Sequence, residues 1–181
     1  MKKLFVIITL GFTILSCNKN QKDDFPSVIK NQKTIEFKRL KRVKGTRIFA
    51  KIPENYVFST KSQRYQKTDS LSIQFTEFGL GSINFYKAKP SFKRSAFESK
   101  GLKIDVLKDV RFNDLDAIFG DGPSSSKKVN ERETFFIFGD DEFLVMVKGV
   151  YQKRDTIGRK EILEIFKNLN HQKDLKFPVL D

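Results

Sequence analysis

The pattern of hydrophobic and polar positions predicts a chain built mainly from β-strands. Apolar and polar residues alternate over residues 47–52 and 71–76, which is typical of strands that bury one face. Gly79 and Gly81 indicate a turn after the second of these strands, so residues 82–86 are expected to return as its hairpin partner. Shorter strands are expected at residues 56–58, 102–106 and 115–119.

Two longer hydrophobic runs predict the centre of the sheet. Residues 134–138 and 143–150 are almost entirely apolar, and the acidic segment 139–142 between them indicates a hairpin turn. Strands that are apolar on both faces are covered on both sides, so we expect these two in the middle of the sheet. A loop is expected before them, from Gly120 to Arg132. The chain has 19 Phe and no Trp, so Phe is expected to fill most of the core.

Two helices are expected from the helical spacing of apolar residues. The first covers residues 90–101, where Ser91 is a candidate N-cap and Gly101 a candidate C-terminal stop. The second begins at Thr156, with Asp155 or Thr156 as its cap. Its apolar positions are Ile162, Leu163, Phe166 and Leu169. The order strands, helix, strands, helix predicts an α+β domain, an antiparallel β-sheet with two main helices packed on it.

The N-terminus has the character of an export signal. A basic start precedes an apolar run of about a dozen residues, shorter than the roughly 20 that span a membrane. Residues 14–17, Ile-Leu-Ser-Cys, resemble a bacterial lipobox, in which the Cys receives acyl chains such as palmitate. The alternative is an ordinary secreted protein with a stray Cys. We expect a signal peptide at 1–16, a membrane anchor at Cys17, a flexible tether at 17–33 and one globular domain at 34–181.

A short polar segment after Cys17 bears on location. Residues 21–24, Gln-Lys-Asp-Asp, resemble the lysine-plus-acid-pair signal that sends lipoproteins to the cell surface in some Gram-negative bacteria. We therefore expect a lipid-anchored protein of the outer membrane that faces the cell surface. The alternative is a periplasmic location, with a linker that happens to carry two acids.

Charge adds a second candidate site. The formal net charge is +13, and residues 30–51 concentrate the excess, with nine basic side chains and one acid. Clustered cations attract phosphates and sulfates, so lipopolysaccharide, sulfated glycans or DNA are candidate ligands. The alternative is a solvated face beside the membrane. The candidate anion-binding residues are Lys38, Arg39, Lys41, Arg42, Lys44 and Arg47.

Motifs for catalysis are absent from the sequence. The chain has one Cys and one His, which excludes disulfide scaffolds, zinc fingers and Cys/His proteases. His171 is expected to be a solvated residue at the end of the last helix, and residues 124–126 a loop without a nucleophile frame. The acids at 140–142 are expected to form a solvated hairpin tip. We expect no enzyme activity, no cofactor and no metal.

The order of elements carries a family resemblance. The segment Ile52-Pro53-Glu54-Asn55-Tyr56 comes early, a helix at 91–100 is followed by Gly, and the hairpin at 136–150 precedes the last helix. Over residues 46–170 this order resembles the PsbP-like proteins. The resemblance implies an α/β/α sandwich whose members mostly bind other proteins or act as accessory factors, without a shared site motif.

Together these features lead to two functional hypotheses. The first is a lipid-anchored, non-enzymatic binding or accessory module that grips another envelope protein with one face of its sheet. The second is a surface lipoprotein that binds anionic ligands through residues 30–51.

Overall fold

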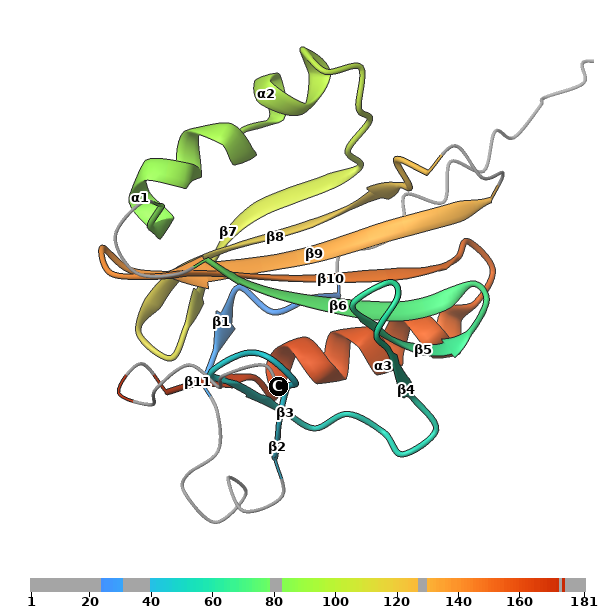
Figure 1. The fold of residues 1–181 in the computed structure, drawn as a ribbon. Helices are drawn as coiled ribbons and strands as arrows, with labels where there is room; N and C mark the ends of the chain where they lie inside the picture. The colour runs from blue at the N-terminus through green and yellow to red at the C-terminus, as the bar shows by residue number, and fades with distance from the viewer. Residues whose placement is uncertain (1–23, 31–39, 79–82, 127–129, 173, 175–181) are drawn as a thin grey trace, which may run out of the picture.

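The protein is built in three layers around one large β-sheet (Figure 1). The computed structural model describes residues 24–30, 40–78, 83–126, 130–172 and 174. On one face of the sheet lie the short helices α1 (Phe85–Ala88), η2 (Lys89–Phe92) and α2 (Arg94–Glu98). On the other face lie α3 (Thr156–Lys167) and a three-stranded sheet in the order β11 (Asn170–His171), β3 (Ile48–Ala50) and β2 (Lys41–Arg42).

The large sheet has eight strands, antiparallel except for the first pair. In spatial order they are β1 (Val28–Ile29), β7 (Val106–Phe112), β8 (Leu115–Pro123), β9 (Glu131–Gly139), β10 (Leu144–Gln152), β6 (Leu71–Phe78), β5 (Arg64–Thr68) and β4 (Val57–Ser59). The predicted α+β class with a mainly antiparallel sheet is confirmed.

The central position predicted for the two apolar runs is also confirmed. In strand β9, the side chains of Phe136 and Phe138 pack in the core shared with α3. The side chains of Phe135 and Ile137 pack in the core shared with α1 and α2. Because side chains alternate between the two faces, a strand covered on both sides must be apolar at nearly every position. Helix α3 packs closely on β10, because a Cβ at Gly149 would lie 2.5 Å from a methyl carbon of Ile162.

The helical layer on the opposite face differs from the prediction. Residues 82–86 were expected in a returning strand, but residues 83–84 lie in no strand and α1 begins at Phe85. The Asn84 carboxamide oxygen caps this helix by accepting from the Lys87 N–H at 2.9 Å. The single helix expected at 90–101 is broken, because Lys93 has extended backbone (ψ 151°) and separates η2 from α2. Gly101 does end this segment, with φ of 67°, the left-handed region that glycine adopts without strain.

Strand β8 is longer than predicted and includes residues 120–123, which the sequence analysis assigned to a loop. The Asp121 side chain is 1% exposed and explains the difference. Its carboxylate accepts from Tyr151 Oη of β10 at 2.6 Å and from Arg132 Nε of β9 at 3.0 Å. Strand β7, in contrast, begins later than predicted, at Val106, and residues 102–105, expected in a strand, precede it.

The packed domain begins earlier than residue 34. Residues 24–30, which the sequence analysis assigned to the tether, pack on the large sheet. The Phe25 ring stacks on Phe119 with centroids 4.2 Å apart, and the Asp24 carboxylate lies 2.7 Å from Arg159 of α3. The second acid of the expected surface-export signal is therefore bound to the domain. The expected signal peptide, Cys17 and the rest of the expected tether lie outside the described residues.

Helices long and apolar enough to cross a membrane were sought over the described part of the chain, and none is present.

Candidate functional site

A buried ionic joint connects the three-stranded sheet to the large sheet. Arg47 precedes β3, Glu77 lies on β6 and His171 lies on β11, and their side chains are only 3%, 1% and 3% exposed. The Glu77 carboxylate accepts from the Arg47 backbone N–H at 2.8 Å, from Arg47 Nε at 2.7 Å and from His171 Nε2 at 2.8 Å. The joint thus satisfies one buried acid with donors from two separate strands.

The joint corrects two sequence-based expectations. Arg47 was a candidate anion-binding residue, but it is buried against Glu77 and does not reach a surface ligand. His171 was expected to be solvated, but its ring stacks on Phe143 with centroids 4.0 Å apart. Burial raises the pKa of Glu77, but the hydrogen bonds from His171 and Arg47 outweigh this effect, and the pKa lies below its ordinary value.

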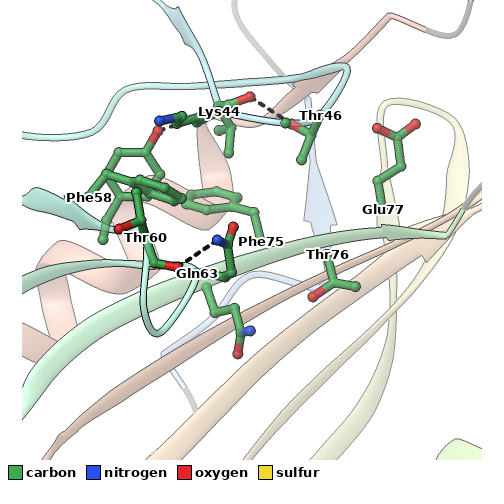
Figure 2. A pocket seen from close by; sticks show the side chains of 12 residues that line it. Lys44, Thr46, Phe58, Thr60, Gln63, Phe75, Thr76 and Glu77 are labelled. Atoms are coloured by element: carbon green, nitrogen blue, oxygen red, sulfur yellow. Dashed lines mark hydrogen bonds between the residues drawn. The ribbon is translucent and has the colours of Figure 1, made fainter. Parts of the chain in front are cut away.

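A hollow of about 510 Å³ lies beside this joint (Figure 2). One wall is the turn at residues 43–46, which connects β2 to β3, and the other walls are the β4–β5 hairpin and β6. The turn closes with a hydrogen bond from the Thr46 N–H to the Val43 carbonyl at 3.2 Å, and Gly45 adopts a left-handed φ of 75°. Figure 2 shows Phe75 and Glu77 projecting from β6 toward the turn.

Aromatic rings form one side of this hollow. The Tyr65 ring meets the rings of Phe58 and Phe75 edge to face, with centroids 5.0 Å and 5.8 Å away. The Tyr65 hydroxyl accepts from the Lys44 backbone N–H at 3.2 Å, and Lys44 Nζ lies 5.3 Å from the Phe58 ring centroid. The aromatic wall is therefore fixed to the turn that carries the lysine.

A second depression, here called the α3 groove, lies between α3 and residues 51–54. Its volume is about 620 Å³. Its apolar lining residues are Ile52, Pro53, Ile157 and Ile165. Ile157, in the first turn of α3, is 71% exposed.

Lysines surround the α3 groove, and they come from three separate segments. Lys41 lies on β2, Lys51 follows β3 and Lys160 lies on α3, and within the described residues none of the three has an ion-pair partner. Two of the acids that line the groove are already paired. Glu161 lies 2.7 Å from Lys67, and Glu164 lies 2.8 Å from Lys167.

One lining acid of the α3 groove, Glu54, has no ion pair among the described residues. The rim still keeps more cations than unpaired acids. The groove combines an apolar floor with a positive rim, so it complements a ligand that is both apolar and acidic.

The fold divides the predicted basic cluster rather than gathering it. Lys41 and Lys51 face the α3 groove, whereas Lys44 lines the hollow of Figure 2. Arg42 uses its Nε to donate to the Thr46 carbonyl at 2.8 Å, and Arg47 is buried. Lys38, Arg39 and Cys17 lie outside the described residues.

Some lining residues were missed by sequence analysis. Ile157, Lys160, Glu161 and Glu164 line the α3 groove from one face of the helix. Ile165 on the same face is buried, whereas the exposed residues of this face are polar except for Ile157. This apolar residue in a polar stripe was a usable signal. The hollow gave no such signal, because the residues at 43–46, 58–65 and 74–77 are brought together only by the tertiary fold.

Acidic side chains near these sites have partners within the fold. Across the described ranges, no group of three His, Cys, Asp or Glu side chains is placed to hold a metal ion. The acidic hairpin tip folds as a turn, in which the Asp140 carboxylate accepts from the N–H groups of Glu142 and Phe143 at 2.8 and 3.2 Å. Glu77, the acid that lines the hollow, is fully engaged in the joint.

Comparisons with known proteins leave the function open. No family model and no curated protein sequence matches the chain. A crystal structure of a protein from Bacteroides thetaiotaomicron VPI-5482 is similar with a TM-score of 0.45 and 14% sequence identity. The similarity covers 73% of this chain and 48% of the Bacteroides chain, so this chain spans about half of that protein.

The ionic joint predicts an acid-sensitive domain. A lowered pKa at Glu77 means that its contribution to stability is complete above the ordinary value of 4.5 and is lost as the pH falls below it. Glu77→Gln leaves the Arg47 guanidinium buried without its counter-charge and should lower the free energy of unfolding by about 3–5 kcal/mol at pH 7. Urea unfolding followed by circular dichroism from pH 7 to pH 3 measures both effects.

The Glu77→Gln variant should also lose less stability than the wild type between pH 6 and pH 3, because the titrating carboxyl group of Glu77 is absent. Glu98→Gln, at an exposed position on α2, is the matched control and should change the free energy of unfolding by less than about 0.5 kcal/mol. Equal pH dependence of the wild type and Glu77→Gln would contradict the role assigned to the joint.

Proposed function

We propose that the protein is a lipid-anchored, non-enzymatic binding module that holds another envelope protein in its α3 groove. The observation that carries this proposal is the combination of an apolar floor with three unpaired lysines around one depression. The proposed occupant is a segment of the partner that carries apolar and acidic residues. Apolar side chains would cover Ile157, which is 71% exposed, and acids would meet Lys41, Lys51 and Lys160.

Both faces of the large sheet are covered, which supports the α3 groove rather than a face of the sheet as the binding surface. The initial expectation was that a face of the sheet grips the partner, but helices or the three-stranded sheet cover both faces of the central strands (Figure 1). Addition of a partner strand is also disfavoured, because the edge strands β1 and β4 have only two and three residues.

We also propose that the domain is a divergent relative of the PsbP-like proteins. The three-layer arrangement and the order of elements from residue 46 to 170 support this. The proposed location is the outer membrane with the domain at the cell surface. Binding of a polyanion along residues 30–51 is less well supported, because the fold directs these side chains to different places.

Charge reversal in the α3 groove should abolish partner binding. A photoreactive residue at position 157, introduced in cells, should crosslink to one envelope protein, and mass spectrometry should locate the crosslink in an apolar, acidic segment. Lys51→Glu should reduce the crosslink yield at least tenfold, since it replaces an attraction with a repulsion. The yield is measured at equal protein level in the membrane fraction.

Lys100→Glu is the matched control, because Lys100 is exposed at the end of the helical layer on the opposite face. It should leave the crosslink unchanged. Equal losses from Lys51→Glu and Lys100→Glu would indicate a diffuse charge effect and contradict the proposal. Crosslinking to nucleic acid or lipopolysaccharide instead of protein would favour the polyanion hypothesis.

Loss of the anchor should release the domain without unfolding it. Cys17→Ser changes a residue of the proposed tether, so the free energy of unfolding should change by less than about 0.5 kcal/mol. Membrane attachment depends on the acyl chains, with the basic residues adding a salt-sensitive contribution. Fractionation of cells at high salt and thermal melting of the purified protein test both parts.

Retention of Cys17→Ser in the membrane at high salt would contradict lipid anchoring at this residue. A large fall in melting temperature would contradict the independence of the fold from the anchor.

A further inference from the structure

The hollow of Figure 2 is separate from the α3 groove and has a different chemistry. Its volume of about 510 Å³ lies within the range of small-molecule sites. It is lined by aromatic rings, amides and hydroxyl groups, with one lysine at its rim. We propose that this hollow binds a sugar ring that carries one anionic group, a carboxylate or a phosphate.

The aromatic side of the hollow is suited to stacking against the ring of a sugar. The faces of the half-buried Phe58 and Tyr65 rings carry the negative part of the aromatic quadrupole, and the C–H groups on one face of a pyranose carry partial positive charge. Phe75 is 9% exposed and supports these rings from the core. A saccharide can therefore stack on this wall while its hydroxyl groups point outward. The edge-to-face contacts among the three rings fix their orientation before a ligand arrives.

The polar side chains account for the hydroxyl groups of the ligand. Gln63 lies at the rim, and its carboxamide N–H donates to the Thr60 carbonyl at 2.7 Å, which holds the amide in place. The amide oxygen and its second N–H stay available, so one side chain can both accept from and donate to sugar hydroxyls. Gln63 has a left-handed φ of 51°, a backbone conformation that costs energy for a non-glycine residue and that is often found at functional sites.

The charges around the hollow favour a ligand that carries an anionic group. Glu77 is the acid that lines the hollow, and it is paired with the Arg47 guanidinium and hydrogen-bonded to His171. Lys44 Nζ has no carboxylate partner in the described part of the chain. A ligand carboxylate or phosphate that meets Lys44 would supply the missing counter-charge, while a paired carboxylate for hydrolysis is absent from the described lining.

Calorimetric titration of the purified chain, as cells produce it, tests the proposal with four probes: D-glucuronate, glucose 6-phosphate, D-glucose and inorganic phosphate. At least one of the two anionic sugars should bind at least tenfold more tightly than either glucose or inorganic phosphate. Lys44→Met should weaken binding of that sugar at least tenfold and leave glucose within twofold. Phe58→Leu should weaken the anionic sugar and glucose alike.

Lys100→Met, which removes an exposed lysine from the opposite face of the large sheet, is the matched control and should leave all four affinities unchanged. The proposal is overturned if neither anionic sugar binds, if inorganic phosphate binds as tightly as the sugars, or if Lys44→Met has no effect. These outcomes are independent of the protein partner, because the partner is tested by Lys51→Glu and the sugar by Lys44→Met.

Discussion

The hydrogen-bonded ion pair between Arg47 and Glu77 is the contact on which the arrangement of both depressions depends. It joins the three-stranded sheet to β6 and leaves neither charge exposed to water. The three-stranded sheet supplies the turn at 43–46 to the hollow, and Lys41 and Lys51 to the α3 groove. A buried charge without its partner is strongly unfavourable, so this joint holds the small sheet in one position.

The joint also explains why a strongly basic segment does not form one basic surface. Lys41 and Arg42 are successive residues of β2, so their side chains point in opposite directions. Lys44 and Arg47 lie in the connection from β2 to β3, and Lys51 follows β3, so these cations reach different environments. One cation is buried in the joint, one reaches the aromatic hollow and two reach the α3 groove. Each depression thereby receives positive charge together with its own lining, which favours two distinct ligands over one extended polyanion.

Local pattern was sufficient for the centre of the fold. The hairpin of β9 and β10 and helix α3 with its Asp155 cap follow from runs of apolar residues, turn residues and a capping side chain within a few positions of one another. Features that depend on distant partners were missed. Arg47 is buried because of Glu77, 30 positions away, and Asp121 because of Tyr151, also 30 positions away. Neither pairing leaves a periodic signal in the sequence.

The same limit applies to the N-terminus and to the site. Residues 24–30 form a segment too short to show a periodic pattern, although they include Phe25, Val28 and Ile29. Only the stacking of Phe25 on Phe119 and the contact of Asp24 with Arg159 show that they belong to the domain. The basic segment was visible from composition, but its division was not, because it depends on the register between β2 and β3.

Amide hydrogen exchange of Glu77→Gln at pH 7, compared with wild type, tests the central role of the joint most directly. The account predicts that β3 and β11 lose more protection than β9 and β10, because the small sheet is released while the large sheet stays folded. Equal losses in all four strands, or unchanged protection of β3 and β11, would contradict it.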